Sequence, residues 1–531
     1  MSDQHWTQRV HVAALALCAV FLPWSTAFLS MAQMLLVVNW IASGVLLGTV
    51  RERWRAAFTR PPVLVFLAFL GLHVVGLLWT TDLKWGGDLV RILLPVLSFG
   101  AVLGGSDRLS RPAFRTILLL GAWSVVACAL FGALFSQARA DDYRGLSLFI
   151  SHIRLVLLLC LAIAVFVWKG WHGPWWERLA RGLAILWCLY FINRLGSVQG
   201  FAIVGVLGLV LVWRTVGGAR RWVLWSVRAA LLVVPIVAAS WVVREVRSRT
   251  IPPPQDMRFM PRFTVNGEPY IHEVNKVQQQ NGHHLWTYLA WGELRNNWLK
   301  RSKRSMDSQD DRGHVLWATV VRYMSGKGLT KDSVGVWALT DEDIRRIEQG
   351  VPDHLEGKRS MLQERFDEVV FEWQHYLDEG ATNGHSMTMR LEYWRTGWTI
   401  AKANWPIGVG TGDTQVAFNE AYEHMGTDLA REWWHRAHNE YLTLWISFGL
   451  FGLAFALFTW WWPAYALGAW SDPLFVAWAV IFGISCLTDD TVETQAGATF
   501  FALYYALLVF AAPRPLSGEE ARRSPPGPAP V

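Results

Sequence analysis

The chain has 531 residues, of which 53% are hydrophobic, 14% aromatic and only 17% charged. In soluble proteins about a quarter of the residues are charged. The present composition therefore argues against a soluble globular protein and indicates an integral membrane protein. The net charge of +7 does not indicate a nucleic-acid partner, because the basic residues lie in short loops between apolar runs rather than along one stripe.

The cysteines argue against a disulfide framework and a cysteine-type zinc site, because each lies inside an apolar run and the large polar segment has none. They are Cys18, Cys128, Cys160, Cys188 and Cys486. The first apolar run is not followed by a small-residue cleavage site and a soluble domain. We therefore interpret it as a spanning helix rather than a removed signal.

A membrane-spanning helix needs about 20 mostly apolar residues, and twelve runs approach this length. They are Val12–Leu29, Ala32–Val50, Pro62–Thr80, Leu89–Gly105, Phe114–Ser136, Ile153–Trp168, Leu179–Phe191, Phe201–Val216, Trp222–Val243, Glu440–Trp460, Pro473–Leu487 and Ala496–Phe510. The predicted fold is an all-α, polytopic transmembrane helix bundle of about twelve spans, with one large, mostly helical water-facing segment.

Alternate loops are rich in arginine and lysine, and the loops between them are poor in both. The rich loops contain Arg51–Arg60, Arg108–Arg115, Lys169–Arg181 and Arg214–Arg221. Because such loops stay in the cytoplasm, both termini are predicted inside and residues 244–437 outside, which is the periplasm if the membrane is the inner membrane of a Gram-negative bacterium. The predicted domains are an N-terminal bundle of about nine spans (1–243), the periplasmic segment (244–437), three C-terminal spans (438–512) and a disordered cytoplasmic tail (513–531).

The water-facing segment opens with Pro252–Pro254, which predicts a stiff, extended exit from the membrane. Apolar residues at helical spacing predict amphipathic helices over residues 362–377 and Met389–Trp405. A glycine-rich loop, Pro406–Asp413, follows the second helix. It lacks the Gly-Lys-Ser/Thr sequence of a Walker loop and therefore does not indicate nucleotide binding.

Three arginines, Arg91, Arg154 and Arg194, lie at the predicted outer ends of spans. A charge at membrane depth costs several kcal/mol unless it is paired, which makes each a functional candidate. The alternative is that the side chains extend to the interface. Three guanidinium groups around one outer vestibule would suit an anionic ligand, because their N–H groups match phosphate oxygens.

His438 and Asn439 lie where the chain re-enters the membrane. A histidine there can titrate near neutral pH and act as a general base; the alternative is an ordinary boundary histidine, like His435 three residues earlier. Arg390 and Arg395 lie on the second predicted amphipathic helix, where a solvated basic face is the alternative to a binding role.

Four motifs occur in order along the second half of the chain. They are Asn193–Arg194, Met389–Trp394 leading to Pro406–Gly410, His438–Leu442 followed by Gly449–Leu453, and the acidic turn Asp489–Gln495. In this topology the set resembles the superfamily of O-antigen ligases and O-antigen polymerases, which are bacterial envelope glycan enzymes. The resemblance runs from about residue 150 onward and is strongest over 388–495. Asn193 replaces the family's serine, and the polar stretch Arg262–Gly380 is longer than many members carry, which puts the acceptor in doubt.

The resemblance implies a membrane glycosyltransferase that moves a glycan from undecaprenyl diphosphate to an acceptor on the periplasmic face, here by O-antigen ligation to lipid A-core. It implies inverting, metal-independent transfer without a cofactor, with the lipid-linked glycan donor, the lipid A-core or growing glycan acceptor and membrane lipids as partners. It places catalytic roles on His438, Arg194 and Arg390, and substrate-binding roles on Arg154, Arg91, Asn439 and Glu493.

Two alternatives stay within this class: an O-antigen polymerase and a protein O-oligosaccharyltransferase, which share the same motifs. A transporter or lipid flippase with twelve helices is the alternative from another class. Transporters usually have repeated halves and charges near the midplane. No half-to-half repeat is evident here, and the candidate residues collect at one face, which favours an enzyme.

Overall fold

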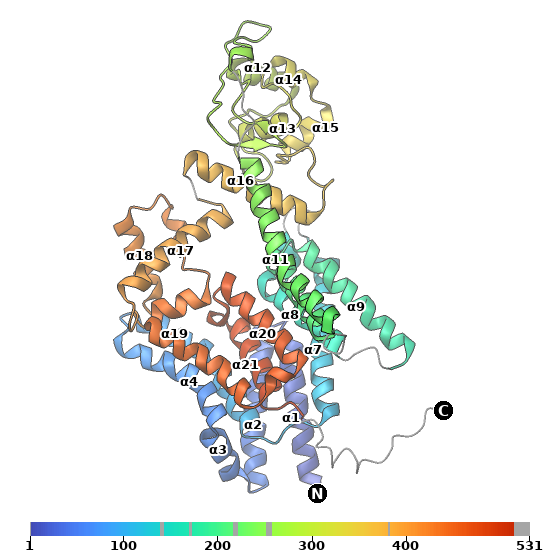
Figure 1. The fold of residues 1–531 in the computed structure, drawn as a ribbon, viewed down its shortest axis with the longest axis vertical. Helices are drawn as coiled ribbons and strands as arrows, with labels where there is room; N and C mark the ends of the chain where they lie inside the picture. Colours follow the sequence, from blue (N-terminus) through green and yellow to red (C-terminus); the bar gives the residue numbers. More distant parts are fainter. Residues whose placement is uncertain are drawn as a thin grey trace. The chain divides into compact units, whose positions relative to one another are not determined.

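The computed structural model describes residues 2–137, 143–168, 173–215, 221–250, 257–380 and 383–513. In these ranges the regular structure is almost all helical, with long irregular stretches in residues 257–290 (Figure 1). The strands described there are β1 (Gln279–Gln280) and β2 (His283–His284), which pair antiparallel. The predicted all-α fold is confirmed. The proline exit at 252–254 and the tail from residue 514 lie outside the described residues.

The chain divides into two compact units. The first contains Met1–Leu211, Tyr393–Gly426 and His435–Val531, and the second contains Val212–Glu392 and Thr427–Trp434. Each unit is held together by its own hydrophobic core.

The helices of the first unit are mostly apolar. They are α1 (Ser2–Phe21), α2 (Thr26–Leu46), α3 (Val50–Thr59), α4 (Pro61–Val75), α5 (Leu83–Ile92), α6 (Leu94–Gly104), α7 (Arg111–Phe135), α8 (His152–Trp168), α9 (Trp175–Arg194), most of α10 (Val198–Thr215), α18 (Thr414–Met425), α19 (Glu440–Ala466), α20 (Pro473–Thr488) and α21 (Gln495–Val509).

Six helical segments in the described residues are long and apolar enough to cross a membrane, and three shorter ones are also apolar. The six are Thr26–Leu46, Pro61–Trp79, Leu83–Gly104, Arg111–Phe135, Val198–Thr215 and Glu440–Ala466. The multi-pass prediction is confirmed, with one correction. The run Val12–Leu29 is not one span, because α1 ends at Phe21 and Ser25 caps the start of α2 by accepting a hydrogen bond from the Phe28 amide.

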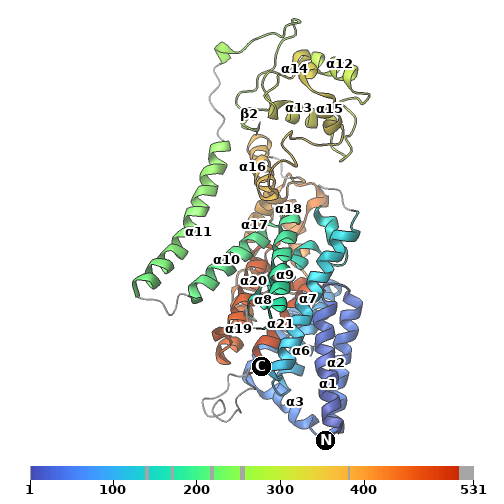
Figure 2. The same ribbon diagram turned by 90° about the vertical axis from the view of Figure 1, so that its right-hand side faces the viewer.

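Helix α21 forms the centre of the first unit. Every residue from Gly497 to Val509 is buried, as expected for a helix that is apolar on all sides. Its Tyr505 ring stacks on Phe66 of α4 with centroids 4.5 Å apart, and Phe501 stacks on Phe482 of α20 at 4.8 Å. Helices α7, α8 and α9 lie side by side beside this centre (Figure 2).

The second unit contains most of the segment that is predicted to face water. Its helices are α11 (Arg221–Thr250), α12 (Trp291–Arg301), α13 (Leu316–Gly326), α14 (Ser333–Ala338), α15 (Asp341–Glu348), α16 (Met361–Glu379) and the first part of α17 (Ser386–Ala403). Helix α11 continues beyond the predicted span to Thr250, and Arg249 there pairs with Asp367 of α16 at 2.5 Å. Both predicted amphipathic helices are present, as α16 and α17.

Residues 257–360 of the second unit form an insert with a core of its own. The fully buried side chains include Trp298 of α12, and Val320, Tyr323 and Met324 of α13. The polar stretch that distinguishes the sequence is therefore a packed subdomain.

The glycine-rich loop, Pro406–Asp413, packs against helix α19 and supports it. The Val409 and Gly410 amides donate to the carbonyls of Ile446 and Ser447, at 2.9 and 2.8 Å. Helix α19 breaks at Gly449, where φ is +66°, and an added Cβ there would lie 2.2 Å from the Pro406 carbonyl. Only glycine fits so close a backbone crossing. The loop is thus a structural clamp that fixes the start of α19.

Candidate functional site

His438 lies in the short connection immediately before α19. Its φ is +46°, which is uncommon for a residue other than glycine and typical of functional sites. This turn lets Asn439 cap α19, with the Asn439 Oδ1 accepting from the Leu442 amide at 3.1 Å. The side chain of His438 remains 39% exposed. The imidazole is therefore fixed by its backbone and open on one side.

Asp489, at the end of α20, faces the ring of His438. The His438 Nδ1 lies 3.6 Å from the Asp489 Oδ1. Burial acts to raise the pKa of Asp489, but the neighbouring His438 and the charge of Arg154 outweigh it and lower this pKa to about 2. An ionised carboxylate beside Nδ1 favours a proton on that nitrogen and leaves Nε2 free to accept one.

Arg154 of α8 holds the other oxygen of Asp489. It forms an ion pair with Oδ2, and its remaining donors reach Thr494 Oγ1 at 3.1 Å and the Asp490 carbonyl at 3.2 Å. Both side chains of the pair are largely buried. All these acceptors belong to the protein, so in this structure Arg154 orients the acidic turn that orients His438.

Glu493 and Asn439 are also engaged with protein groups. Glu493 pairs with Arg436, whose guanidinium lies 5.2 Å from the ring centroid of Trp85. Burial raises the pKa of Glu493, and Arg436 opposes that shift. The Asn439 amide donates to the Leu487 carbonyl at 3.2 Å and ties α19 to α20.

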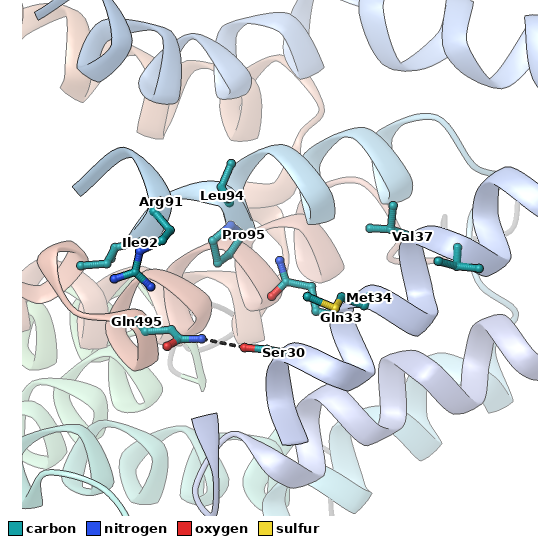
Figure 3. Close-up of a pocket in the computed structure, with 10 residues that line it drawn as sticks. Ser30, Gln33, Met34, Val37, Arg91, Ile92, Leu94, Pro95 and Gln495 are labelled. Atoms are coloured by element: carbon teal, nitrogen blue, oxygen red, sulfur yellow. Dashed lines mark hydrogen bonds between the residues drawn. The ribbon is translucent and has the colours of Figure 1, made fainter. Parts of the chain in front are cut away.

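A cavity of about 420 Å³ opens between α2, the α5–α6 junction and the start of α21 (Figure 3). Arg91 and Gln495 lie together towards one end of it, and Val37 lies at the other. The Gln495 amide donates to Ser30 Oγ at 2.8 Å. Arg91 is exposed and pairs with Asp88 of its own helix at 3.1 Å. The cavity thus has a polar, basic end and an apolar end.

The turn between α20 and α21 connects His438 to this cavity. Within seven residues it supplies Asp489 to His438, Thr494 to Arg154 and Gln495 to the cavity. Displacing the turn would therefore disturb both the histidine and the cavity.

Arg194 and Arg390 differ in their surroundings. Arg194 is the last residue of α9. The side chains of Ile192, two residues earlier, and of Val156 in α8 both lie against Gly200 of α10, so the ends of these three helices are close together. Among the residues that the structure describes, the half-buried side chain of Arg194 has no hydrogen-bond or ion-pair partner. Arg390 belongs to the second unit and donates to Ser386 Oγ at 3.4 Å. The predicted convergence of Arg194, Arg390 and His438 stays a prediction.

Sequence reasoning missed two residues of this arrangement. Asp489 was noted only as part of an acidic turn, and Tyr393 only as part of a motif, although its ring centroid lies 5.8 Å from that of His438. The acidic turn before the last helix was the available signal for Asp489, because a carboxylate near a re-entrant histidine is a natural partner.

Part of the chain matches a known protein family. Residues 333–457 match the family described as O-antigen ligase. This part of the chain carries an O-antigen ligase domain. The match contains Arg390, His438 and Asn439, and the resemblance to the O-antigen ligase superfamily is confirmed. The O-antigen ligase domain and the apolar helices together indicate a multi-pass bacterial membrane protein of the glycan-transferring kind. A search of curated proteins finds no match.

Proposed function

We propose that the chain transfers a glycan from undecaprenyl diphosphate to an acceptor hydroxyl at the periplasmic face of the inner membrane, with lipid A-core as the acceptor. The contact between His438 and the ionised Asp489 in the first unit carries the proposal. It is the arrangement that a general base requires: one ring nitrogen held by a carboxylate and the other available.

In the proposed reaction the acceptor oxygen attacks the anomeric carbon of the donor sugar. The Nε2 of His438 takes the hydroxyl proton as the new C–O bond forms. The bond from the anomeric carbon to phosphate breaks, and the lipid diphosphate leaves with the electron pair. A single displacement of this kind inverts the anomeric centre and draws on no metal or cofactor.

Cationic groups would stabilise the leaving diphosphate. Arg194 is suited to this role because its guanidinium is half-buried and has no protein partner in the described part of the chain. Arg390 is assigned to it from the family motif. Each such donor is worth on the order of 3–4 kcal/mol when charge develops in the transition state.

The cavity beside the acidic turn suits the lipid carrier. Its apolar end along Met34, Val37 and Val38 would hold the start of the polyprenyl chain, with Arg91 near the phosphates. An exposed arginine bound only to Asp88 on its own helix can exchange that partner for a phosphate oxygen at little expense.

Deletion of the gene tests the proposal and separates it from its alternative. Unattached long chains on the lipid carrier, with lipid A-core lacking them, are expected for a ligase. Loss of long chains altogether would instead assign a polymerase. Unchanged lipopolysaccharide banding would contradict both, and would direct attention to a protein acceptor.

A further inference from the structure

The second unit contains a second cavity, of about 340 Å³, between the insert and helix α16, which the proposed transfer reaction does not use. It lies between the chain after β2, helix α13 and helix α16. Three half-buried aromatic rings line it: Trp286, Trp317 and Phe371. Its size and aromatic lining are those of a small-molecule site, large enough for one or two sugar rings.

The aromatic wall is held rigid by polar contacts. The indole N–H of Trp286 donates to the side-chain oxygen of the buried Gln278, whose amide in turn contacts His375 Nδ1 at 2.7 Å. The Trp286 ring also lies 4.3 Å from the ammonium of Lys276. Fixed, flat, apolar faces of this kind match the C–H faces of a pyranose ring.

Arg322 supplies a cation to the cavity. Its guanidinium stacks on Phe371 at 3.7 Å and donates through Nε and Nη2 to Gln280 Oε1, at 3.2 and 3.1 Å. Among the described residues no carboxylate forms an ion pair with it. Arginine has five N–H donors, so the remaining donors are available to an anionic group.

Further hydrogen-bonding groups, both neutral and charged, complete the lining. Burial, with the charges of His375 and Arg322, lowers the pKa of His385 to about 4. His385 is therefore uncharged at neutral pH and has one donor and one acceptor nitrogen, as sugar hydroxyls require. Glu379, which also lines the cavity, lies 3.7 Å from His375.

We propose that this cavity, formed by Trp286, Trp317, Phe371 and Arg322, binds a saccharide unit that carries a carboxylate. The rings stack on the sugar face and the guanidinium binds the carboxylate. The choice of a saccharide over other small anions rests on the proposed function. The insert would then hold one acidic residue of a glycan that the enzyme handles.

Binding to the full chain in nanodiscs tests the proposal, with three probes: methyl β-glucuronide, methyl β-glucoside and acetate. Saturation-transfer NMR or tryptophan fluorescence reports each one. The glucuronide is expected to bind about 10-fold more tightly than the glucoside, since one charge-assisted pair separates them. Acetate alone should bind too weakly to detect.

Variants assign the contacts. Arg322→Gln should reduce the affinity for the glucuronide to that of the glucoside, and Trp317→Ala should weaken both. Trp337→Ala serves as the control, because Trp337 lies on α14 of the same insert, 56% exposed and outside the cavity. Arg322→Lys, which keeps the charge and loses the fork, covers the case in which Arg322→Gln fails to fold, and should give an intermediate affinity.

Absence of glucuronide binding at millimolar concentration overturns the proposal, as does binding that Arg322 and Trp317 variants leave unchanged. All measurements are repeated in a His438→Ala background. If the wild-type chain binds the saccharide but transfers no glycan, the proposed function is refuted and this site stands. If it transfers glycan but does not bind the saccharide, this site is refuted and the proposed function stands.

Discussion

At the scale of residues, His438, Asp489 and Arg154 form a chain of three charged or titratable groups. Arg154 and His438 lower the pKa of Asp489, and an ionised Asp489 favours a proton on Nδ1 of His438. The arginine is buried and the histidine side chain is partly exposed, which is compatible with the proposed role of His438 as a general base that meets the substrate.

Removing Arg154 is expected to destabilise the protein more than removing Arg91. Arg154→Gln leaves the buried Asp489 carboxylate without its partner, at a cost of about 3–5 kcal/mol. Arg91→Gln breaks an exposed pair within one helix, worth at most about 1 kcal/mol. Thermal unfolding of the purified variants in one detergent measures both. Equal melting temperatures for the two would show that the buried pair is unimportant for stability.

Two of the sequence assignments gain a physical reading from the structure. Arg154 and Glu493 were assigned to substrate binding from residue type and position, and the structure gives both of them protein partners. Sequence spacing cannot show this pairing, because Arg154 and Asp489 lie 335 residues apart in the chain and Arg436 and Glu493 lie 57 apart. Arg194 remains the arginine of the three whose donors are free in the described part of the chain.

At the scale of elements, the loop Pro406–Asp413 and the break in α19 depend on each other, because the loop crosses the helix where it breaks. Asp413 accepts hydrogen bonds from the amides of Thr81 and Asp82, at 2.8 and 2.7 Å, so the same loop also fixes the start of α5. The glycine pattern was visible in the sequence, but its purpose was not, because a close crossing of two backbones depends on tertiary structure.

Gly449→Ala is expected to destabilise the protein by about 2–4 kcal/mol. The new methyl would meet the Pro406 carbonyl at 2.2 Å, and the residue would keep a positive φ. Gly71→Ala is the matched control, because no atom lies within 4 Å of its added Cβ and it sits inside α4 with ordinary helical geometry. Thermal unfolding compares them. A melting temperature of Gly449→Ala equal to that of the control would refute the clamp.

The insert should become more stable as pH rises above neutrality. Burial lowers the pKa of Lys331 to about 7 from its ordinary 10.5, although the charge of Asp332 opposes this. Between these values the unfolded chain binds a proton that the folded insert does not, so stability rises with pH by roughly 1.4 kcal/mol per unit.

Hydrogen exchange of the α13 amides at pH 7 and pH 9, corrected for the intrinsic rate, measures this dependence. Lys331→Met removes the titrating group and should flatten the profile. An equally steep profile in Lys331→Met would place the effect on another group.

At the scale of the whole molecule, the helical fold follows closely from composition and periodicity. The runs of apolar residues predicted most helices of the first unit. Helices α3 and α18 were not among them, and a turn after Phe21 with the Ser25 cap interrupts one predicted run. The insert was less predictable. Its core is formed by residues of short helices, such as Trp298 of α12 and Leu316 of α13. These helices show no long periodic pattern in the sequence, so the core is evident only in the structure.

Cysteine labelling tests the predicted orientation of the chain. Ser305 is an exposed residue of the insert, and all five native cysteines are buried. Ser305→Cys should react with an impermeant maleimide once the outer membrane is opened, while the inner membrane is intact. A cysteine in the loop after α2, Gly48→Cys, should remain unlabelled until the inner membrane is opened. The opposite pattern would invert the topology and remove the periplasmic site.

Glycan transfer by purified variants in nanodiscs, with a lipid-diphosphate-linked donor and lipid A-core, tests the central claim most directly. His438→Ala is expected to lose roughly 100- to 10,000-fold in transfer rate while still binding donor, since it removes only the base. His435→Ala is the control: His435 lies beside the site, with ring centroids 6.2 Å from His438, and its loss should reduce the rate far less. Transfer by His438→Ala at the wild-type rate would contradict the account.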